Sequence, residues 1–317
     1  MNYTQNNSQL LYEEDNSAAI SDNVLIDDVS WFIGETILTG MLLEVASYPK
    51  PGLVSSVSQG AHSDMNILTF MLSSSSISSS FVLFAQAGLD CQGEPAELLS
   101  EIRTTGVEFE KKLLQSTGNV NTQRGILFAG GVFAAAAGYS YSRLKQHSLA
   151  DVFQTSALMT KGLSDRELNR ELLESKKILT AGEKLFLEFG TTGIRGEVEK
   201  GFPSVRDMGL PAFNEAIAEG CRLNDCLVHA LISLVTCVDD STILWRKGAG
   251  ALDMIREKAR EILVCGSVFT PKGKKKIKRL NDLCIRENLS PGGSADLLSV
   301  TVSSYLLINK SFPVLKM

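Results

Sequence analysis

The sequence predicts an all-α protein, built as a single multi-helix domain with functional loops between its helices. After residue 24, apolar residues recur at helical spacing through most of the chain, whereas alternating strand patterns are scarce. No composition shift, no proline- or glycine-rich stretch and no internal repeat divides this part of the chain. With 317 residues, 44% of them hydrophobic, the chain can bury one large core or two smaller ones. One helical domain over residues 24–317 is the economical interpretation.

Residues 1–23 are polar, with scattered apolar positions and no sustained period, which indicates a flexible N-terminal extension. A first helix is predicted over residues 24–47. It must end before Pro49 and Pro51, because a residue that precedes proline disfavours helical geometry. Further helices are predicted over residues 65–88, 95–116, 125–141, 149–160, 181–189, 212–220, 225–238, 249–264, 272–288 and 294–309.

The composition argues against several classes of protein. Thirty-one Lys and Arg residues against 36 Asp and Glu leave a formal charge of −5, so the chain as a whole does not attract nucleic acid. The six cysteines form no CxxC pair, which argues against a zinc site and a disulfide framework. The N-terminus lacks a secretory signal, and the apolar run at residues 126–138 is shorter than the ~20 residues that span a bilayer. We therefore expect a cytoplasmic protein that binds neither membrane nor nucleic acid.

The loop between the first two predicted helices contains groups suited to binding and catalysis. It reads PKPGLV from residue 49 and GAHSDM from residue 60. Lys50 can reach a phosphate as a point charge, and His62 and Asp64 can act as a metal-binding or acid–base pair. The structural alternative for Asp64 is to cap the N-terminus of the following helix.

Two further segments combine glycines with hydroxyl, amide and guanidinium groups. TGNVNTQRG, residues 117–125, precedes an alanine-rich helix, so its backbone amides and the helix dipole can face an anion. It lacks the GxxxxGK[ST] spacing of a P-loop, and a glycine at a helix start is often only a turn. TTGIRGE, residues 191–197, adds a carboxylate at Glu197, or it is simply an exposed connection between helices. The candidate phosphate ligands in these two segments are Asn121, Thr122, Arg124, Gly125 and Arg195.

Two adjacent carboxylates, Asp239 and Asp240, follow a long apolar helix and precede Ser241 and Thr242. Hard oxygen ligands of this kind suit Mg²⁺, which usually keeps waters and bridges to substrate phosphates. The structural alternative is a solvated helix end. Because helix C-termini disfavour acidic groups, the cost of this placement favours a functional role. Arg246 follows as another candidate phosphate ligand.

The last polar segment, NLSPGGSADLL at residues 288–298, is typical of a helix start. We expect Ser290 to cap the helix and Pro291 to be its first residue. The two glycines that follow would open the first turn to a ligand, since each costs roughly 1 kcal/mol against alanine in a helix. The binding candidates in this segment are Ser290, Gly292, Gly293 and Asp296.

In this order, the segments resemble the triphosphoribosyl-dephospho-CoA synthase family associated with citrate lyase and malonate decarboxylase. The resemblance covers about residues 30–305, and PKPGLV and SPGGSADLL carry it most strongly. The chain departs from the family pattern at Gln123, where a histidine is common, and at Arg124, where a lysine is common. Arginine preserves the charge, whereas glutamine cannot titrate.

The resemblance implies an enzyme, a pentosyltransferase that moves the triphosphoribosyl group of ATP to the ribose 2′-hydroxyl of 3′-dephospho-CoA and releases adenine. The product would be the precursor of the citrate lyase or malonate decarboxylase prosthetic group, passed to a prosthetic-group transferase or an acyl carrier protein. The implied inversion at C1 of the ribose needs a base and stabilisation of the departing purine, as two carboxylates provide in inverting glycosidases. The catalytic candidates are Asp239, Asp240, Asp64 and Glu197, with Mg²⁺ at Asp239 and Asp240.

Two other functions fit the same residues. A non-catalytic helical nucleotide-binding protein needs the phosphate donors but no base, and a Mg²⁺-dependent nucleotide phosphohydrolase would use the same metal. Release of adenine, as opposed to ADP or phosphate, distinguishes these possibilities. The sequence does not decide which carboxylate is the base, which of the two pathways receives the product, or the oligomeric state.

Overall fold

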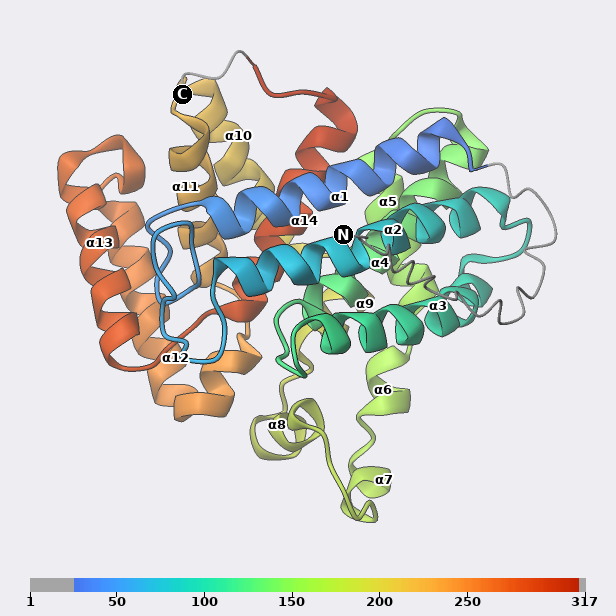
Figure 1. The fold of residues 1–317 in the computed structure, drawn as a ribbon, viewed down its shortest axis with the longest axis horizontal. Coiled ribbons are helices and arrows are strands. Elements are labelled where there is room, and N and C mark those ends of the chain that lie inside the picture. Colours follow the sequence, from blue (N-terminus) through green and yellow to red (C-terminus); the bar gives the residue numbers. More distant parts are fainter. Residues whose placement is uncertain (1–25, 314–317) are drawn as a thin grey trace, which may run out of the picture.

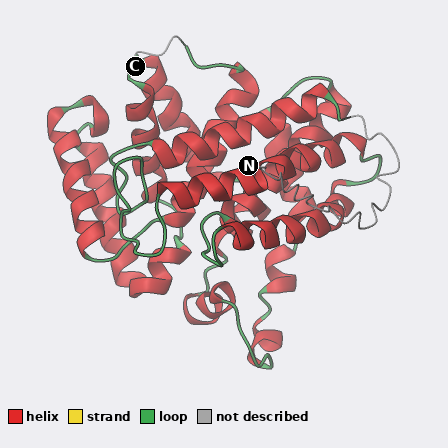
Figure 2. Cartoon of the chain, viewed as in Figure 1, coloured by secondary structure: helices red, strands yellow, loops and turns green. Residues whose placement is uncertain are grey.

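The computed structural model describes residues 26–313, which form helices and connecting loops with no β-strand among them (Figure 2). The predicted all-α fold class is confirmed. The predicted N-terminal extension, residues 1–23, lies outside the described residues. The elements are α1 (Asp28–Ala46), α2 (Ile67–Asp90), α3 (Pro95–Ser116), α4 (Arg124–Leu144), α5 (Leu149–Thr160), α6 (Leu163–Glu167), α7 (Arg170–Glu174), α8 (Ala181–Phe189), α9 (Gly193–Glu199), the π-helical turn η1 (Val205–Gly209), α10 (Leu210–Ala218), α11 (Leu223–Val235), α12 (Ser241–Val264), the 3₁₀ turn η2 (Ser267–Phe269), α13 (Pro271–Arg286) and α14 (Gly292–Asn309).

Four long helices, α1, α2, α4 and α14, form the centre of the fold. Helices α1 and α2 lie side by side, and α14 passes behind α1 in Figure 1. Helix α2 packs most extensively on α4, and α14 packs against α1, α4 and α11. Buried side chains from these helices, such as Phe81 of α2 and Phe133 of α4, belong to one continuous hydrophobic core. This core is the frame that carries the loops of the molecule.

The contact between α2 and α4 depends on two glycines. A Cβ atom on Gly88 would lie 2.0 Å from the carbonyl oxygen of Ala135, and one on Gly138 would lie 2.1 Å from that of Ala85. The two backbones therefore touch where the helices cross. This contact explains why the apolar run of α4 is rich in alanine and glycine, since larger side chains would separate the helices.

Helices α1 and α2 are each long and apolar enough to cross a membrane, judged by length and composition alone. In this structure they pack against each other; α1 also packs against α4 and α14, and α2 also packs against α3 and α4. Their inward-facing apolar side chains lie in the protein core.

The loop between α1 and α2 contacts the second half of the chain at one side of the frame. The loop between α1 and α2 lies beside α12 and α13, whereas α6, α7 and α8 project at the lower edge of Figure 1. The N–H of Gly52 in this loop donates to Asn281 of α13, and the carbonyl of Ala61 accepts a hydrogen bond from Arg246 of α12. Hydrogen bonds between residues far apart in the sequence thus hold the loop against the second half of the chain.

The sequence predicts the limits of α3 and α5 as the structure has them, but it misplaces the start of α12. That helix begins at Ser241, well before the predicted residue 249, because the side chain of Asp240 caps its first turn. A non-helical residue, Gly248 with φ of 75°, then interrupts it. The short helices α6, α7 and α9 were not predicted, because none of them is long enough to show a helical period.

Two predicted caps are also wrong. Helix α14 begins at Gly292 and has Pro291 as its N-cap, so Ser290 does not cap a helix that starts at Pro291. The structural alternative for Asp64 fails as well, because Asn66 caps α2 through hydrogen bonds from the backbone N–H groups of residues 68 and 69. Both Ser290 and Asp64 are therefore available for other contacts.

The crossing of α2 and α4 leads to a stability prediction. Gly138→Ala should lower the free energy of unfolding by about 1–3 kcal/mol, because the new methyl group meets a backbone carbonyl that cannot easily move. Gly250→Ala is the matched control, since nothing lies within 4 Å of its Cβ position in α12. The control should be neutral or stabilising by up to about 1 kcal/mol. Urea unfolding of both variants tests the prediction, and equal stability of the two would contradict it.

Candidate active site

A cavity of about 760 Å³ collects the polar and glycine-rich segments that the sequence places far apart. Its walls come from the α1–α2 loop, the start of α4, helix α9 and the residues after it, the start of α12 and the start of α14. The predicted site residues that line it are His62, Asp64, Asn121, Thr122, Arg124, Gly125, Arg195, Glu197, Asp239, Arg246, Ser290, Gly292, Gly293 and Asp296. Lys50 and Asp240 are buried and do not line it. The structure brings the predicted residues together, and their individual roles stay predictions.

Three long helices begin at the cavity wall. Arg124, Ser241 and Gly292 are the first residues of α4, α12 and α14, and all three line the cavity. The N-terminus of a helix carries a partial positive charge and backbone N–H groups without partners inside the helix. Three such ends around one cavity favour negative charge there, whether it belongs to a carboxylate of the protein or to a bound phosphate.

Asp240 connects two of these helix starts. Its Oδ1 accepts hydrogen bonds from the N–H groups of Thr242 and Ile243 in α12, at 3.1 and 3.4 Å. Its Oδ2 accepts from the N–H and the hydroxyl of Ser294 in α14, at 3.0 and 3.3 Å. Burial raises the pKa of this carboxyl group, and the backbone donors oppose that rise. The Asp240 side chain therefore connects the first turns of α12 and α14.

The contacts of this carboxylate pair do not fit the predicted Mg²⁺ site. A carboxylate has about four lone-pair sites, and the four donors around Asp240 occupy them. Asp239 is exposed, and its Oδ1 lies 2.6 Å from Nη2 of Arg256. Among residues 26–313, no group of three or more His, Cys, Asp and Glu side chains is arranged to hold a metal ion. The chain offers no preformed pair of free carboxylates here.

Lys50 lies beneath the cavity with a partner of its own. Its ammonium group is 2.5 Å from Oε1 of Glu44 and 2.6 Å from the carbonyl oxygen of the same residue. Burial lowers the pKa of Lys50 and raises that of Glu44, while their mutual attraction opposes both shifts. Direct contact between Lys50 and a phosphate, as predicted, would require this buried ion pair to open. Glu44 itself lines the cavity.

His62, Ser290 and Arg246 form a connected polar group on the cavity wall. Nη2 of Arg246 lies 3.2 Å from Nδ1 of His62, whose Nε2 lies 2.8 Å from the hydroxyl of Ser290. A guanidinium group only donates, so Nδ1 accepts and Nε2 carries the proton that is donated to Ser290. Burial and the charge of Arg246 lower the pKa of His62, which favours this neutral form. The Ser290 hydroxyl is left with a proton to donate to a ligand.

Glu197 faces the cavity from the end of α9. Its oxygens accept hydrogen bonds from the N–H of Ser204, at 2.7 Å, and from the hydroxyl of Ser204, at 2.9 Å. Burial raises the pKa of Glu197 above the ordinary value for a glutamate, although these donors lower it. A half-buried carboxylate with a raised pKa is a stronger base than an exposed one.

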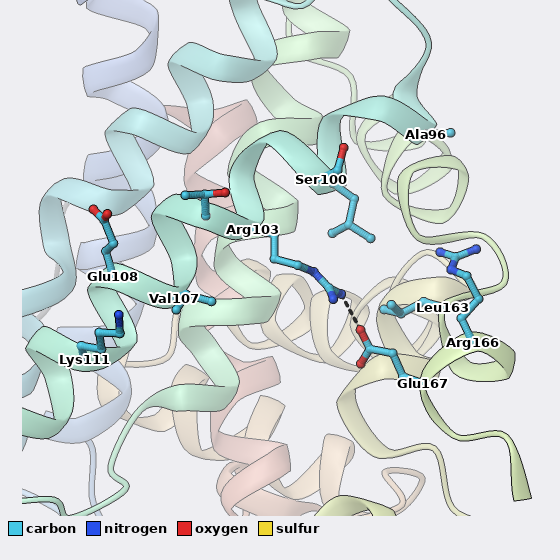
Figure 3. A pocket seen from close by; sticks show the side chains of 11 residues that line it. Ala96, Ser100, Arg103, Val107, Glu108, Lys111, Leu163, Arg166 and Glu167 are labelled. Carbon is cyan, nitrogen blue, oxygen red and sulfur yellow. Dashed lines mark hydrogen bonds and ion pairs between the residues drawn. The ribbon is translucent and has the colours of Figure 1, made fainter. Parts of the chain in front are cut away.

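Two of the arginines that line the cavity are already paired. Arg124 pairs with Glu110 of α3, and Nε of Arg195 lies 2.7 Å from Oε2 of Glu167. Glu167 also pairs with Arg103 of α3, in a second hollow between α3 and α6 (Figure 3). None of the predicted site residues lines this second hollow. It meets the candidate site through Glu167, which holds Arg195 in place.

The serines of α2 support the loop before α4. The hydroxyl of Thr122 donates to Ser73, and Ser74 donates to the side-chain oxygen of Gln123, at 2.8 and 3.1 Å. Gln123 is buried at the cavity wall. Its side chain therefore positions the start of α4, whereas Asn121 beside it is exposed to the cavity.

Asp296 approaches the start of α4 from α14. A Cβ atom on Gly125 would lie 1.9 Å from Oδ2 of Asp296, so only glycine leaves room for this carboxyl group. Burial and the negative charges of Glu44 and Asp240 raise the pKa of Asp296 well above the ordinary value for an aspartate. The backbone N–H of Ile126, in the first turn of α4, opposes the shift. The group nevertheless faces the cavity.

Comparison with known proteins identifies the family of this chain. The family model for ATP:dephospho-CoA triphosphoribosyl transferases matches residues 30–312, which include every segment around the cavity. The chain belongs to this family.

Curated relatives of the triphosphoribosyl transferase family cover nearly the whole chain. A probable 2-(5″-triphosphoribosyl)-3′-dephosphocoenzyme-A synthase from Malonomonas rubra is 45% identical over 287 residues, which are 90% of this chain and 91% of the relative. The 2-(5″-triphosphoribosyl)-3′-dephosphocoenzyme-A synthases of Klebsiella pneumoniae and Pectobacterium atrosepticum are 36% and 33% identical, over 82% and 90% of this chain and 86% and 93% of the relatives. No solved structure matches the chain.

Sequence reasoning missed several residues of this transferase cavity. Glu44 shares its apolar helical stretch with Glu35, and the sequence alone does not distinguish the two acids. Trp245 and Ser204 also line the cavity, but neither stands out in the sequence beside its neighbours. Their positions follow from the path of the chain after α9 and α11.

The buried pair beneath the transferase cavity leads to a second prediction. Lys50→Met should lower the free energy of unfolding by about 3–5 kcal/mol, because it leaves the carboxylate of Glu44 buried without a cation. The double variant Glu44→Gln/Lys50→Met should recover much of this loss, since no lone charge remains. Lys276→Met removes an exposed pair with Glu261 and is the control, which should unfold as the wild type does. A double variant less stable than Lys50→Met, measured by urea unfolding, would contradict the assignment.

Proposed function

We propose that this transferase moves the triphosphoribosyl group of ATP to the ribose 2′-hydroxyl of 3′-dephospho-CoA and releases adenine. The observation that carries the proposal is one cavity in which three helix N-termini and three arginines meet cavity-facing carboxyl groups. The names of the relatives, 2-(5″-triphosphoribosyl)-3′-dephosphocoenzyme-A synthases, describe the product of this reaction. The cavity thus combines sites for phosphates with groups for proton transfer.

The proposed division of labour follows from the contacts in the cavity. The starts of α4, α12 and α14 bind phosphate groups together with Arg124 and Arg195. Glu197 is the proposed base for the attacking 2′-hydroxyl, because it faces the cavity and burial raises its pKa. Asp64 and Asp239 are exposed cavity carboxylates and remain alternative bases.

Mg²⁺ is proposed as a companion of the ATP triphosphate. A magnesium ion usually keeps several waters and is held by one or two carboxylates together with substrate phosphates. Asp239 has an exposed carboxyl group that could supply such a contact if its pair with Arg256 opens. Asp240, with its lone pairs occupied, would act by holding the helix starts in place.

The proposed product is the precursor of a prosthetic group, which a prosthetic-group transferase or an acyl carrier protein would receive in the cytoplasm. Both citrate lyase and malonate decarboxylase are possible final acceptors. The prosthetic groups of both acceptors would require the same triphosphoribosyl transfer.

The reaction itself can be tested directly. Purified protein with ATP, Mg²⁺ and dephospho-CoA should release adenine in step with a product that keeps all three ATP phosphates. ATP alone should be nearly inert, because positioning of the acceptor hydroxyl supplies much of the rate. Chromatography and mass spectrometry measure both products. ADP or inorganic phosphate without adenine would indicate a phosphohydrolase, and ATP binding without turnover would indicate a nucleotide-binding protein.

The phosphate contacts lead to a further prediction. Arg124→Met and Arg195→Met should each cost on the order of 1.5–3 kcal/mol of binding, which is roughly a tenfold to hundredfold higher Michaelis constant for ATP or dephospho-CoA. Arg286→Met is the control, since Arg286 is exposed in α13 and pairs with Glu287 away from the cavity. Steady-state kinetics with each substrate varied in turn is the measurement. Wild-type constants for both substrates in both variants would exclude these residues as phosphate ligands.

A further inference from the structure

Three carboxyl groups meet beneath and beside the cavity, at Glu44 of α1, Asp240 at the start of α12 and Asp296 of α14. The charges of Glu44 and Asp240 both act on Asp296. Lys50 is the cation bound within this group. Three ionised carboxylates with one ammonium group would leave two uncompensated negative charges in a largely buried place, which is costly. A proton on one carboxyl group relieves that cost.

Hydrogen-bond partners decide which carboxyl group holds the proton. Glu44 and Lys50 form a pair whose net charge is zero, whether the shared proton resides on nitrogen or on oxygen. Asp240 accepts from three backbone N–H groups, which can only donate and which favour the ionised form. Neither group therefore needs an additional proton.

Asp296 has the weakest compensation of the three. The backbone N–H of Ile126 and the N-terminal end of α4 favour its ionised form, but no ion pair within residues 26–313 includes Asp296. Arg124, the nearest cation on the facing helix α4, pairs with Glu110. Glu44 and Asp240 face Asp296 from α1 and α12, and both raise its pKa. These contacts place the additional proton on Asp296.

We propose that Asp296 is a neutral carboxylic acid at neutral pH and that it donates its proton to a purine ring nitrogen of the departing adenine. The inference rests on the proposed function and adds to it the group that activates the leaving base. The fold positions Asp296 for this role, since its side chain faces the cavity and Gly125 leaves room for its carboxyl group.

The 2′-oxygen of dephospho-CoA forms a bond to C1 of the ATP ribose while the bond from C1 to N9 of adenine breaks, and the bonding pair passes to the purine. The proton of Asp296 moves to N3 or N7 of the purine, so adenine leaves as a neutral molecule. The hydroxyl proton passes to a second carboxylate, proposed above to be Glu197. Exchange with water then restores both groups.

Substrate binding reinforces this arrangement. Triphosphate and pyrophosphate groups bring several negative charges into the cavity, and nearby negative charge disfavours an ionised carboxyl group. Asp296 therefore keeps its proton in the loaded enzyme until the purine nitrogen becomes basic as the glycosidic bond breaks. An ordinary aspartate would already be ionised at this pH.

The protonation state can be tested without any activity measurement. The infrared spectrum of the wild-type protein at neutral pH should contain a protonated carboxyl band that Asp296→Asn lacks and that the control Asp253→Asn, at an exposed position in α12, retains. Unfolding gives an independent readout. Because the folded pKa is raised, wild-type stability should fall relative to Asp296→Asn as pH rises above the ordinary aspartate range, and it should level off above the folded pKa. Identical spectra and parallel stability curves would overturn the proposal.

The catalytic role needs a second experiment. Asparagine keeps the size and a hydrogen-bond donor but cannot release a proton, so Asp296→Asn should lower kcat by roughly 10²–10⁴-fold with little change in the KM for ATP. ATP analogues that lack N7 or N3, 7-deaza-ATP and 3-deaza-ATP, identify the protonated atom. The analogue that lacks the protonated nitrogen should react slowly with the wild-type enzyme. Asp296→Asn should not slow the reaction of that analogue any further, because the proton transfer is already lost. A change in KM without a change in kcat would overturn the catalytic role. So would a finding that Asp296→Asn slows both analogues by the same factor as it slows ATP.

The two proposals fail in distinguishable ways. If wild-type protein releases no adenine from ATP and dephospho-CoA, the proposed function is wrong, whatever the infrared spectrum shows. If adenine is released and the carboxyl band does not depend on Asp296, the general-acid inference alone is wrong. The analogue experiment uses the wild-type enzyme as well, so a variant that fails to fold does not prevent the test.

Discussion

The buried carboxylate of Asp240 is the contact on which the arrangement of the site depends. It caps α12 through Thr242 and Ile243 and binds the first turn of α14 through Ser294, so two segments 54 residues apart begin side by side. The pairing also sets the position of Asp296, one half-turn further along α14 and opposite Gly125 of α4. A carboxylate at a helix N-terminus is favourable, and this one serves two helices at once. Asp240, whose charge looked costly after α11, is therefore stabilising at the start of α12.

Charge balance under the cavity is the second constraint. A chain with a net charge of −5 must bind substrates that are themselves strongly negative. In the proposed function it does so with helix N-termini and with arginines that have carboxylate partners, such as Arg124 with Glu110 and Arg195 with Glu167. These partners hold the side chains in place, and a bound phosphate can compete for the same N–H groups. Local geometry thus overcomes the unfavourable charge of the whole molecule.

The fold class and the segments that carry fourteen of the residues lining the cavity could be predicted from the sequence, because helical periodicity and motif order are local features. The helices at 95–116 and 149–160 show their limits in their own residues. What failed depends on partners elsewhere in the chain. The early start of α12 follows from the cap by Asp240, and the burial of Lys50 follows from Glu44 in the preceding helix. Ser290 was expected to cap α14, but it binds His62 of a loop 228 residues earlier. Periodicity contains no information about such long-range contacts.

In the proposed reaction, anion binding and proton transfer depend on different kinds of group. Backbone N–H groups at helix starts and arginine side chains do not titrate near neutral pH, so their contacts with phosphates do not depend on protonation. The carboxyl groups of Glu197 and Asp296, in contrast, are half-buried groups whose pKa values are raised by their surroundings. Asp296 differs from Glu197 in having negative neighbours in place of two donors from Ser204. Two carboxyl groups in one cavity can therefore differ in protonation, which is the condition for one to act as base while the other acts as acid.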